Sequence, residues 1–204
     1  MIVYVESNYI LEIALQQEQF KYAQKLLELS QKKIINLVIP SISIIEPYWT
    51  INNKSHKRNK INEYLNQEIK QLNRSSIYNK KSQCLSNVNK YLININISTE
   101  VHLEKTICDM QKKCEIIKFD SNIIKNSRNY NYFKLKKIDL LILTSIIEDL
   151  KTQKSDERKC FISRNSKDFD SPEIKDLLSE YGCILINNFR DGINFINFIL
   201  KLSK

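Results

Sequence analysis

The chain has 204 residues, of which 42% are hydrophobic, and this is enough for one sizeable domain with its own core. Only two glycines and three prolines are present, so helices should dominate, and an all-β sandwich or barrel is disfavoured. The formal net charge of +9 favours polyanionic partners over acidic or neutral ligands.

Short apolar, β-branched segments alternate with segments of helical spacing along the chain. This alternation predicts an α/β fold with a doubly wound, mainly parallel sheet whose strands are buried on both faces. The expected strands are 2–5, 36–39, 115–119, 159–163 and 183–186. The expected helices are 9–15, 18–31, 138–150, 172–181 and 192–200.

The region after Pro40 departs from this alternation, because residues 50–112 have the pattern of two or three long polar helices with no strand between them. We therefore expect one domain over residues 1–204 with a helical insertion at about 50–112. No internal repeat or Pro/Gly linker argues for a second domain.

Basic residues gather in two places. Residues 51–90 hold nine lysines and arginines against two glutamates, a net charge of +7. The second cluster, which contains no acid and leads to Asp139, is Lys125, Arg128, Lys134, Lys136 and Lys137. A nucleic-acid-binding face and the solvated surface of a basic protein explain these clusters equally well, and both interpretations stay open.

The five cysteines and two histidines are scattered, with no CxxC pair, so no zinc site is expected. The odd number of thiols, the lack of a leader-like start and the lack of a membrane-length apolar run together predict a cytoplasmic protein. No Gly-rich phosphate loop, Ser-His-Asp set or Cys-His pair suggests another chemistry.

Four acidic residues lie where the ligand-binding crevice of an open parallel sheet is expected, beyond the carboxyl ends of the strands. Glu6, Glu46 and Asp168 follow the first, second and fourth predicted strands, and Asp139 opens an apolar, buried helix. Carboxylates crowded together repel one another, and a hard cation such as Mg²⁺ or Mn²⁺ resolves the conflict with oxygen ligands. Such a metal supports phosphodiester hydrolysis.

Three of the four acids also have a local structural explanation. Glu6 could cap the following helix, and Ser43 and Glu46 have the spacing of a capping box. Residues 163–170 could form an Asx-rich turn. The shared sheet edge is what these local explanations do not predict.

The order of these motifs resembles the PIN-domain family, and within it the PIN-like proteins with Glu at the first acidic position. The matching stretches are 3–8 (VYVESN), 37–40 (LVIP), 43–47 (SIIEP), 137–142 (KIDLLI) and 161–169 (FISRNSKDF). The motifs are short, so the resemblance depends on their order and spacing, and it covers the chain except residues 50–112.

The resemblance implies a parallel sheet of about five strands between helices and a metal-dependent nuclease, a hydrolase that cleaves RNA, often single-stranded. The implied catalytic residues and ligands of Mg²⁺ or Mn²⁺, direct or through water, are Glu6, Glu46, Asp139 and Asp168. The residues that would orient the ligands or the attacking water are Ser7, Asn8 and Ser163. Asn165 stands where many members have an acid, which leaves Asp168 to serve and puts a second metal in doubt. The basic residues expected to contact nucleic acid are Lys54, Lys57, Arg58, Lys134, Lys136, Lys137 and Arg164.

Three functional hypotheses follow. The first is an endoribonuclease, with RNA favoured over DNA, either as a toxin restrained by an antitoxin or as an RNA-processing or defence enzyme. The second is a catalytically degenerate PIN-like module that binds nucleic acid or a protein partner. The third, a phosphotransferase of another α/β class, is disfavoured because no DxD pair follows the first predicted strand. A homodimer is left open, and no membrane association is expected.

Overall fold

A five-stranded sheet forms the centre of the molecule. The computed structural model describes residues 1–79, 82–154 and 156–202. The strands are β1 (Ile2–Val5), β2 (Asn36–Pro40), β3 (Glu115–Ile117), β4 (Lys159–Ile162) and β5 (Cys183–Ile186), in the order β3-β2-β1-β4-β5. All neighbouring strands pair in parallel, which confirms the predicted parallel sheet. The strand order reverses direction between β1 and β4, so the topological switch point lies at these two strands.

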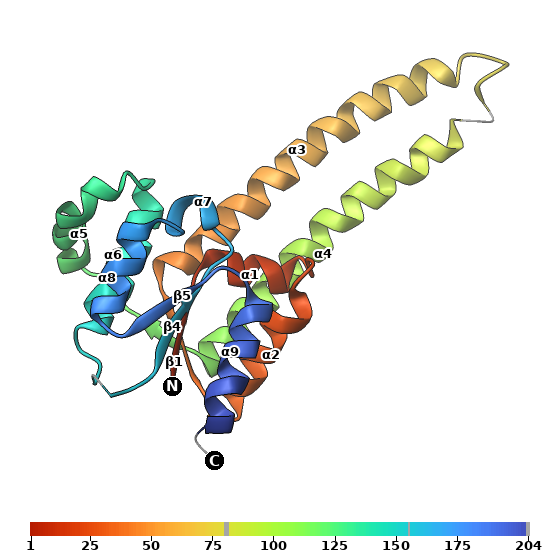
Figure 1. Ribbon diagram of the computed structural model, residues 1–204. Helices are drawn as coiled ribbons and strands as arrows, with labels where there is room; N and C mark the ends of the chain where they lie inside the picture. The colour runs from red at the N-terminus through yellow and green to blue at the C-terminus, as the bar shows by residue number, and fades with distance from the viewer. Residues whose placement is uncertain (80–81, 155, 203–204) are drawn as a thin grey trace.

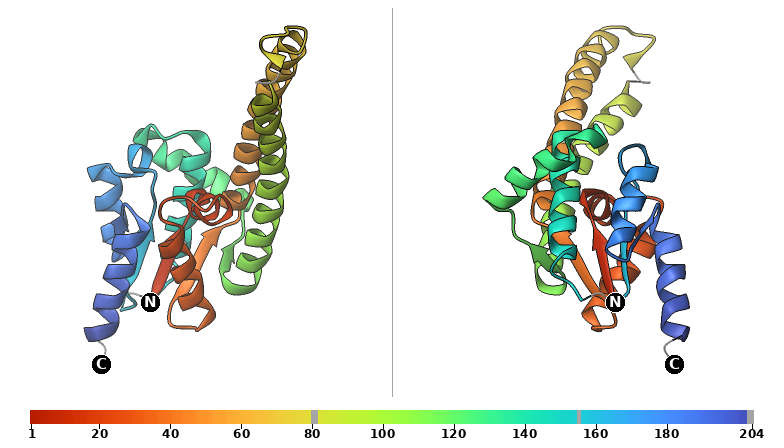
Figure 2. Two further views of the ribbon diagram at one scale, coloured as in Figure 1. Left: turned by 90° about the vertical axis from the view of Figure 1, so that its right-hand side faces the viewer. Right: turned by 60° about the vertical axis from the view of Figure 1, so that its left-hand side comes forward.

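Helices connect the strands and cover both faces of the sheet (Figures 1 and 2). They are α1 (Ser7–Ala14), α2 (Phe20–Gln31), α3 (Ile42–Leu72), α4 (Gln83–Lys113), α5 (Ser121–Asn126), the 3₁₀ helix η2 (Ser127–Phe133), α6 (Lys137–Leu150), α7 (Ser166–Phe169), α8 (Pro172–Glu180) and α9 (Phe189–Leu202). The predicted helices correspond to α1, α2, α6, α8 and α9 within a few residues at their ends. The third predicted strand ends at Ile117, two residues before the predicted end.

Two hydrophobic clusters form the core, one on each face of the sheet. Alternate residues of β1 divide between them, since Val3 and Val5 face α1, α2 and α9, whereas Ile2 and Tyr4 face α6 and α8. Every residue of β1 and β4 is buried, as expected for strands covered on both sides. The carboxyl ends of these strands are therefore held rigidly where a site would lie.

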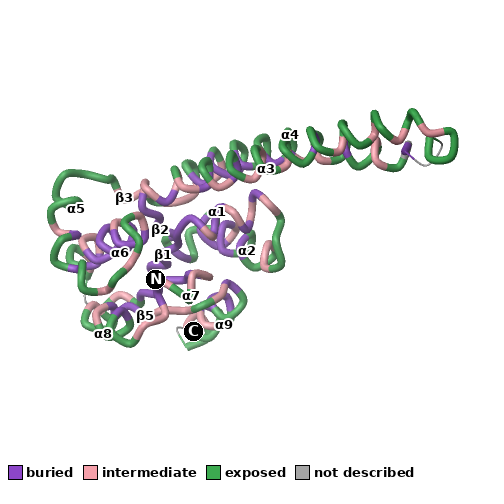
Figure 3. Tube along the Cα trace, turned by 90° about the horizontal axis from the view of Figure 1, so that it is seen from above, coloured by how far each residue is buried: buried purple, intermediate pink, exposed green. Residues whose placement is uncertain are grey.

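Helices α3 and α4 form a long hairpin, which we call the arm, and its distal half projects beyond the rest of the molecule (Figures 1 and 3). At its base, Ile51, Leu103, Ile107 and Met110 are buried in the core cluster that also contains α1 and α2. The arm thus corresponds to the two-helix version of the predicted insertion, but α3 begins at Ile42 rather than near residue 50, and Pro47 lies inside it. Lys80 and Lys81, two of the basic residues counted above, lie outside the described residues.

Further out, polar side chains join the two helices of the arm. Asn62, Asn89 and Asn96 are buried between them. Asn89 donates to Asn66 over 2.6 Å, and Asn96 donates to Asn59 over 3.0 Å. We call this set of contacts the asparagine seam. Many apolar side chains of the two arm helices are exposed.

Two further observations bear on the sequence predictions. In the described part of the chain, no helix has both the length and the apolar character needed to cross a membrane. All five cysteines carry free thiols, with Cys160 and Cys183 buried.

Candidate active site

Glu6 lies at the carboxyl end of β1 and caps α1. Its side chain accepts a hydrogen bond from the backbone N–H of Asn8 at 2.8 Å, so the predicted cap is confirmed. The other carboxylate oxygen accepts from the hydroxyl of Ser163 at 2.9 Å. Glu6 is only 3% exposed. Burial, together with the nearby charge of Glu46, raises the pKa of Glu6 to about 7, although these two hydrogen bonds act to lower it.

Ser163 and Asn165 connect the end of β4 to Glu6 on one side and to Asp139 on the other. The hydroxyl of Ser163 accepts from the backbone N–H of Asn165 at 3.0 Å, while it donates to Glu6. The Asn165 side chain donates from Nδ2 to Oδ1 of Asp139 over 3.2 Å. Asn165 precedes the short helix α7, but its amide does not cap that helix as the predicted Asx-rich turn would suggest, and holds a carboxylate instead.

Asp139 lies in the first turn of α6, and its side chain is largely buried, with 8% exposed. Burial, together with the charges of Asp168 and Glu46, raises the pKa of Asp139 to about 6, while Lys136 and the Asn165 hydrogen bond lower it. Lys136 therefore offsets the buried charge of Asp139 only in part.

Glu46 reaches the same place from α3. Its Oε2 accepts a hydrogen bond from the hydroxyl of Ser7 at 2.5 Å. The capping box considered for Ser43 and Glu46 is wrong, because α3 begins at Ile42 and Glu46 lies more than one turn inside the helix. In the described part of the chain, the buried hydroxyl of Ser43 has no hydrogen-bond partner.

Asp168 completes the set from α7. It forms an ion pair of 3.6 Å with Lys136, whose side chain is mostly exposed. Electrostatic interactions connect Glu6 to Glu46, and Asp139 to both Glu46 and Asp168. We call Glu6, Glu46, Asp139 and Asp168 the carboxylate cluster.

The carboxylate cluster carries more negative charge than its surroundings neutralise. Two of its members are largely buried, and Lys136 is the cation that pairs with the cluster within the described residues. An oxygen-only donor set of this kind fits a hard divalent cation such as Mg²⁺ or Mn²⁺. As the described side chains stand, no three acidic, histidine or cysteine residues are grouped so as to bind one ion directly. The cluster therefore fits a divalent cation by the chemistry of its oxygen donors and by its charge.

Apart from Arg164, the basic residues predicted to contact nucleic acid lie on α3 and around the start of α6. Lys54, Lys57 and Arg58 are on α3, and Arg58 donates to Asn96 over 3.1 Å, so it takes part in the asparagine seam. Lys134 and Lys136 precede α6, and Lys137 begins it. Lys57, Lys134 and Lys137 are exposed.

Arg164 holds a buried carboxylate in place, a structural role beyond the predicted contact with nucleic acid. Its guanidinium forms an ion pair with the fully buried carboxylate of Glu12 in α1 and a second one with Glu18 over 3.0 Å. Glu12 also accepts from the backbone N–H of Gln19. The sequence signal was the position of Glu12 in a largely apolar helix, because a buried carboxylate needs a partner.

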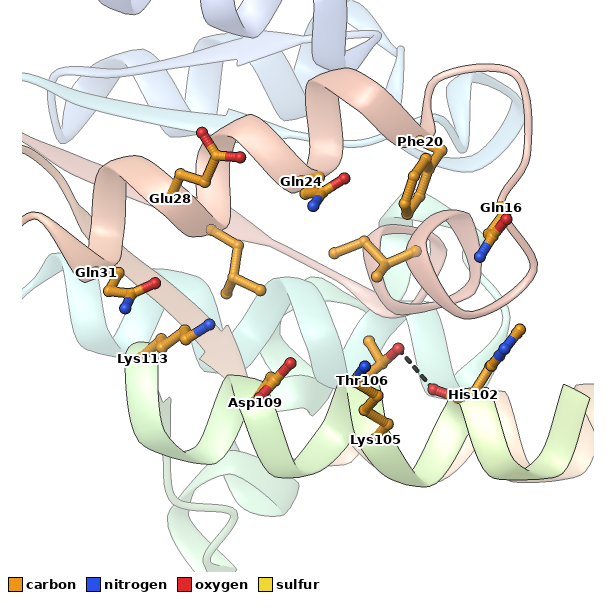
Figure 4. A pocket seen from close by; sticks show the side chains of 12 residues that line it. Gln16, Phe20, Gln24, Glu28, Gln31, His102, Lys105, Thr106, Asp109 and Lys113 are labelled. Atoms are coloured by element: carbon orange, nitrogen blue, oxygen red, sulfur yellow. Dashed lines mark hydrogen bonds between the residues drawn. The ribbon is translucent and has the colours of Figure 1, made fainter. Parts of the chain in front are cut away.

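A pocket of about 340 Å³ lies elsewhere, between α2 and the base of α4 (Figure 4). Its lining mixes polar side chains such as His102 and Asp109 with apolar ones such as Phe20, and none of the four cluster carboxylates lines it. The Thr106 hydroxyl is occupied, since it donates to the backbone carbonyl of His102 at 2.7 Å. The pocket is therefore separate from the carboxylate cluster.

Comparison with known proteins gives no family assignment. No family model matches the chain, and no curated protein matches it. Among solved structures, the crystal structure of VapBC2 from Rickettsia felis bound to a DNA fragment from their promoter is similar to 91% of this chain and 98% of that chain. The sequence identity is 15% and the TM-score is 0.43. At this level of similarity, function has to be argued from the side chains of the site.

Proposed function

We propose that this protein is a metal-dependent endonuclease of the PIN-like type, which hydrolyses phosphodiester bonds of single-stranded RNA in the cytoplasm. The observation that carries the proposal is the carboxylate cluster at the switch point of a parallel sheet, where burial raises the pKa of Glu6 to about 7 and of Asp139 to about 6. Protonation or a cation relieves such a cluster, and the oxygen donors favour Mg²⁺ or Mn²⁺.

In this proposal, the four cluster carboxylates hold the metal directly or through water. A bound Mg²⁺ or Mn²⁺ supplies an activated water and neutralises charge on the phosphoryl group. The protein contributes orientation: Ser7 fixes Glu46, Ser163 and the backbone of Asn8 fix Glu6, and Asn165 fixes Asp139. The free thiols of all five cysteines are compatible with a reducing compartment.

One observation favours a second candidate, a degenerate module that binds nucleic acid or a protein partner without cutting. Asn165 places a neutral amide, and not a further carboxylate, beside Asp139. Its hydrogen bond partly satisfies the carboxylate that a metal would otherwise neutralise. This candidate predicts salt-sensitive binding of RNA with no turnover in Mn²⁺. An antitoxin-like protein partner is compatible with both candidates.

The deciding experiment is cleavage of end-labelled single-stranded RNA and DNA by the purified protein in Mn²⁺, with and without EDTA. Asp139→Asn tests the cluster and keeps the shape of the side chain. Glu180→Gln is the matched acid-to-amide control, because Glu180 is exposed at the end of α8, at the opposite edge of the sheet. Loss of cleavage in EDTA and in Asp139→Asn, but not in Glu180→Gln, is expected. Cleavage that survives in Asp139→Asn contradicts the proposal.

A further inference from the structure

One face of α3 leads outward from the carboxylate cluster along the arm. Glu46, Asn53, Lys57, Lys60 and Tyr64 are spaced 7, 4, 3 and 4 residues apart, which places them on one face of a continuous helix. With a rise of about 1.5 Å per residue, Lys57 lies about 16 Å and Tyr64 about 27 Å along the helix axis from Glu46. The face therefore begins at the carboxylate cluster and continues along the arm.

Two large aromatic side chains on or beside this face are exposed to solvent. Trp49, one helical turn beyond Glu46, is 62% exposed, and Tyr64 is 69% exposed. The aromatic contacts found in the described part of the chain involve neither ring. Every base has a face that can stack on an exposed ring, so the bases of a single strand are suitable ligands for these two side chains.

The positive charge of the same segment favours an anionic ligand. Between Pro47 and Asn62, α3 carries Lys54, Lys57, Arg58 and Lys60 and no acidic residue. Lys57 and Lys60 are exposed on the Glu46 face itself. Two cations that lie between two aromatic rings on one side of a helix suit the phosphates and bases of a single strand. A neutral, apolar protein surface would leave these lysines without complementary groups.

We propose that the Glu46 face of α3 binds single-stranded nucleic acid, with Trp49 and Tyr64 stacking on bases and Lys57 and Lys60 contacting phosphates. We call this surface the arm track. The inference rests on the proposed nuclease function for its direction, because a strand that lies on the arm track runs directly to Glu46 and the carboxylate cluster. It extends that function by naming a binding surface outside the cluster.

Binding is measured with the full-length Asp139→Asn protein, so that cleavage does not interfere. Trp49 is the only tryptophan in the chain, so its fluorescence reports contact with the arm track directly. The probes are unstructured RNA and DNA oligonucleotides of 4 and 12 nucleotides, titrated at several salt concentrations. We expect quenching of Trp49 by the 12-mers and at least about tenfold weaker binding of the 4-mers, which span too little of the track.

Two pairs of variants test the residues. Tyr64→Ala should weaken binding of the 12-mer about tenfold, whereas Tyr91→Ala, at an equally exposed tyrosine of α4 (66%), should change it less than about twofold. Lys57→Gln with Lys60→Gln should reduce the slope of log Kd against log salt by about 1.4, because two phosphate contacts are lost. Lys105→Gln with Lys112→Gln, two exposed lysines at the base of α4, removes the same charge elsewhere.

The outcomes separate this proposal from the nuclease proposal. Equal binding by the arm-track variants and their controls, RNA binding that leaves Trp49 fluorescence unchanged, or no oligonucleotide binding at all overturns the arm track. If the wild-type protein still cleaves RNA in Mn²⁺ in any of these cases, the nuclease proposal stands without it. Arm-track binding by a wild-type protein that never cleaves establishes the track and overturns the nuclease.

Discussion

The hydroxyl of Ser7 lies 2.5 Å from Oε2 of Glu46 and joins two residues that are 39 positions apart in the chain. Ser7 starts α1 directly after β1, whereas Glu46 belongs to α3, the first helix of the arm. The contact fixes the one cluster carboxylate that the arm supplies. The position of the arm relative to the sheet is therefore coupled to the geometry of the carboxylate cluster.

Replacing Ser7 tests this coupling. Ser7→Ala removes the hydrogen bond to Glu46, and we expect turnover in Mn²⁺ to fall about tenfold, with little change in the free energy of unfolding, since one such bond contributes about 1 kcal/mol. Ser43→Ala is the control, because the Ser43 hydroxyl is buried without a partner in the described structure. Its loss should leave turnover unchanged and stability equal or higher. Equal turnover in wild type and Ser7→Ala would contradict the role given to Ser7.

The stability of the metal-free protein should fall as pH rises from about 4.5 to about 7. The folded-state pKa of Glu6, about 7, lies above its ordinary value of 4.5, so in this range the folded chain keeps a proton that the unfolded chain releases. The stabilisation is complete below pH 4.5 and lost above pH 7, with an upper magnitude of roughly 3 kcal/mol. The pKa of Asp139, about 6, acts in the same direction between about pH 4 and 6.

Urea unfolding in EDTA at pH 5 and pH 8 measures this dependence. Glu6→Gln cannot ionise, so its free energy of unfolding should decrease less between these pH values than that of the wild type. Parallel behaviour of the two proteins would show that Glu6 ionises in the folded state as it does in the unfolded chain.

Mn²⁺ should stabilise the protein, and more at pH 8 than at pH 5.5. At the lower pH, protons on Glu6 and Asp139 compete with the cation, because the pKa values of both are raised. At 100 times the Kd, the gain at pH 8 should be about 2.7 kcal/mol. Thermal unfolding with and without Mn²⁺ tests this, with Glu180→Gln expected to respond like wild type. A shift of the same size in Asp139→Asn would place the ion elsewhere.

Arg164 should be required for stability rather than for nucleic-acid binding. Arg164→Ala leaves the buried carboxylate of Glu12 without its cation, and breaking a buried pair costs about 3 kcal/mol, reduced here because the guanidinium is partly exposed. Glu18→Gln removes only the exposed partner of the same guanidinium and should leave the Tm unchanged. A normal Tm for Arg164→Ala, combined with weaker RNA binding, would restore the role predicted from sequence.

The parallel sheet was predictable from sequence because each strand is a short apolar segment buried on both sides, and β1 and β5 have the predicted ends. The position of Glu6 followed from the same signal, since a residue directly after a buried parallel strand lies in the crevice. Its second partner, Ser163, lies 157 residues away and depends on β4 pairing beside β1.

Local patterns failed where a distant contact determined the outcome. The spacing of Ser43 and Glu46 suggested a capping box, but Ser7 holds Glu46 within a helix that starts earlier. The charge of Arg164 suggested a phosphate contact, and nothing in its neighbourhood along the chain predicted that its guanidinium also pairs with Glu12 in α1. No local signal predicts a pairing across 152 residues.

The asparagine seam implies a gradient of local stability along the arm. At the base, Ile51, Leu103 and Met110 are packed in the core, so their backbone amides open only when the core opens. Beyond them, side-chain amide pairs such as Asn89 with Asn66 join the helices, and each contributes little net free energy. Amide hydrogens of the distal arm should therefore exchange with solvent orders of magnitude faster than those at its base, so the outer arm can open and close while the sheet stays folded.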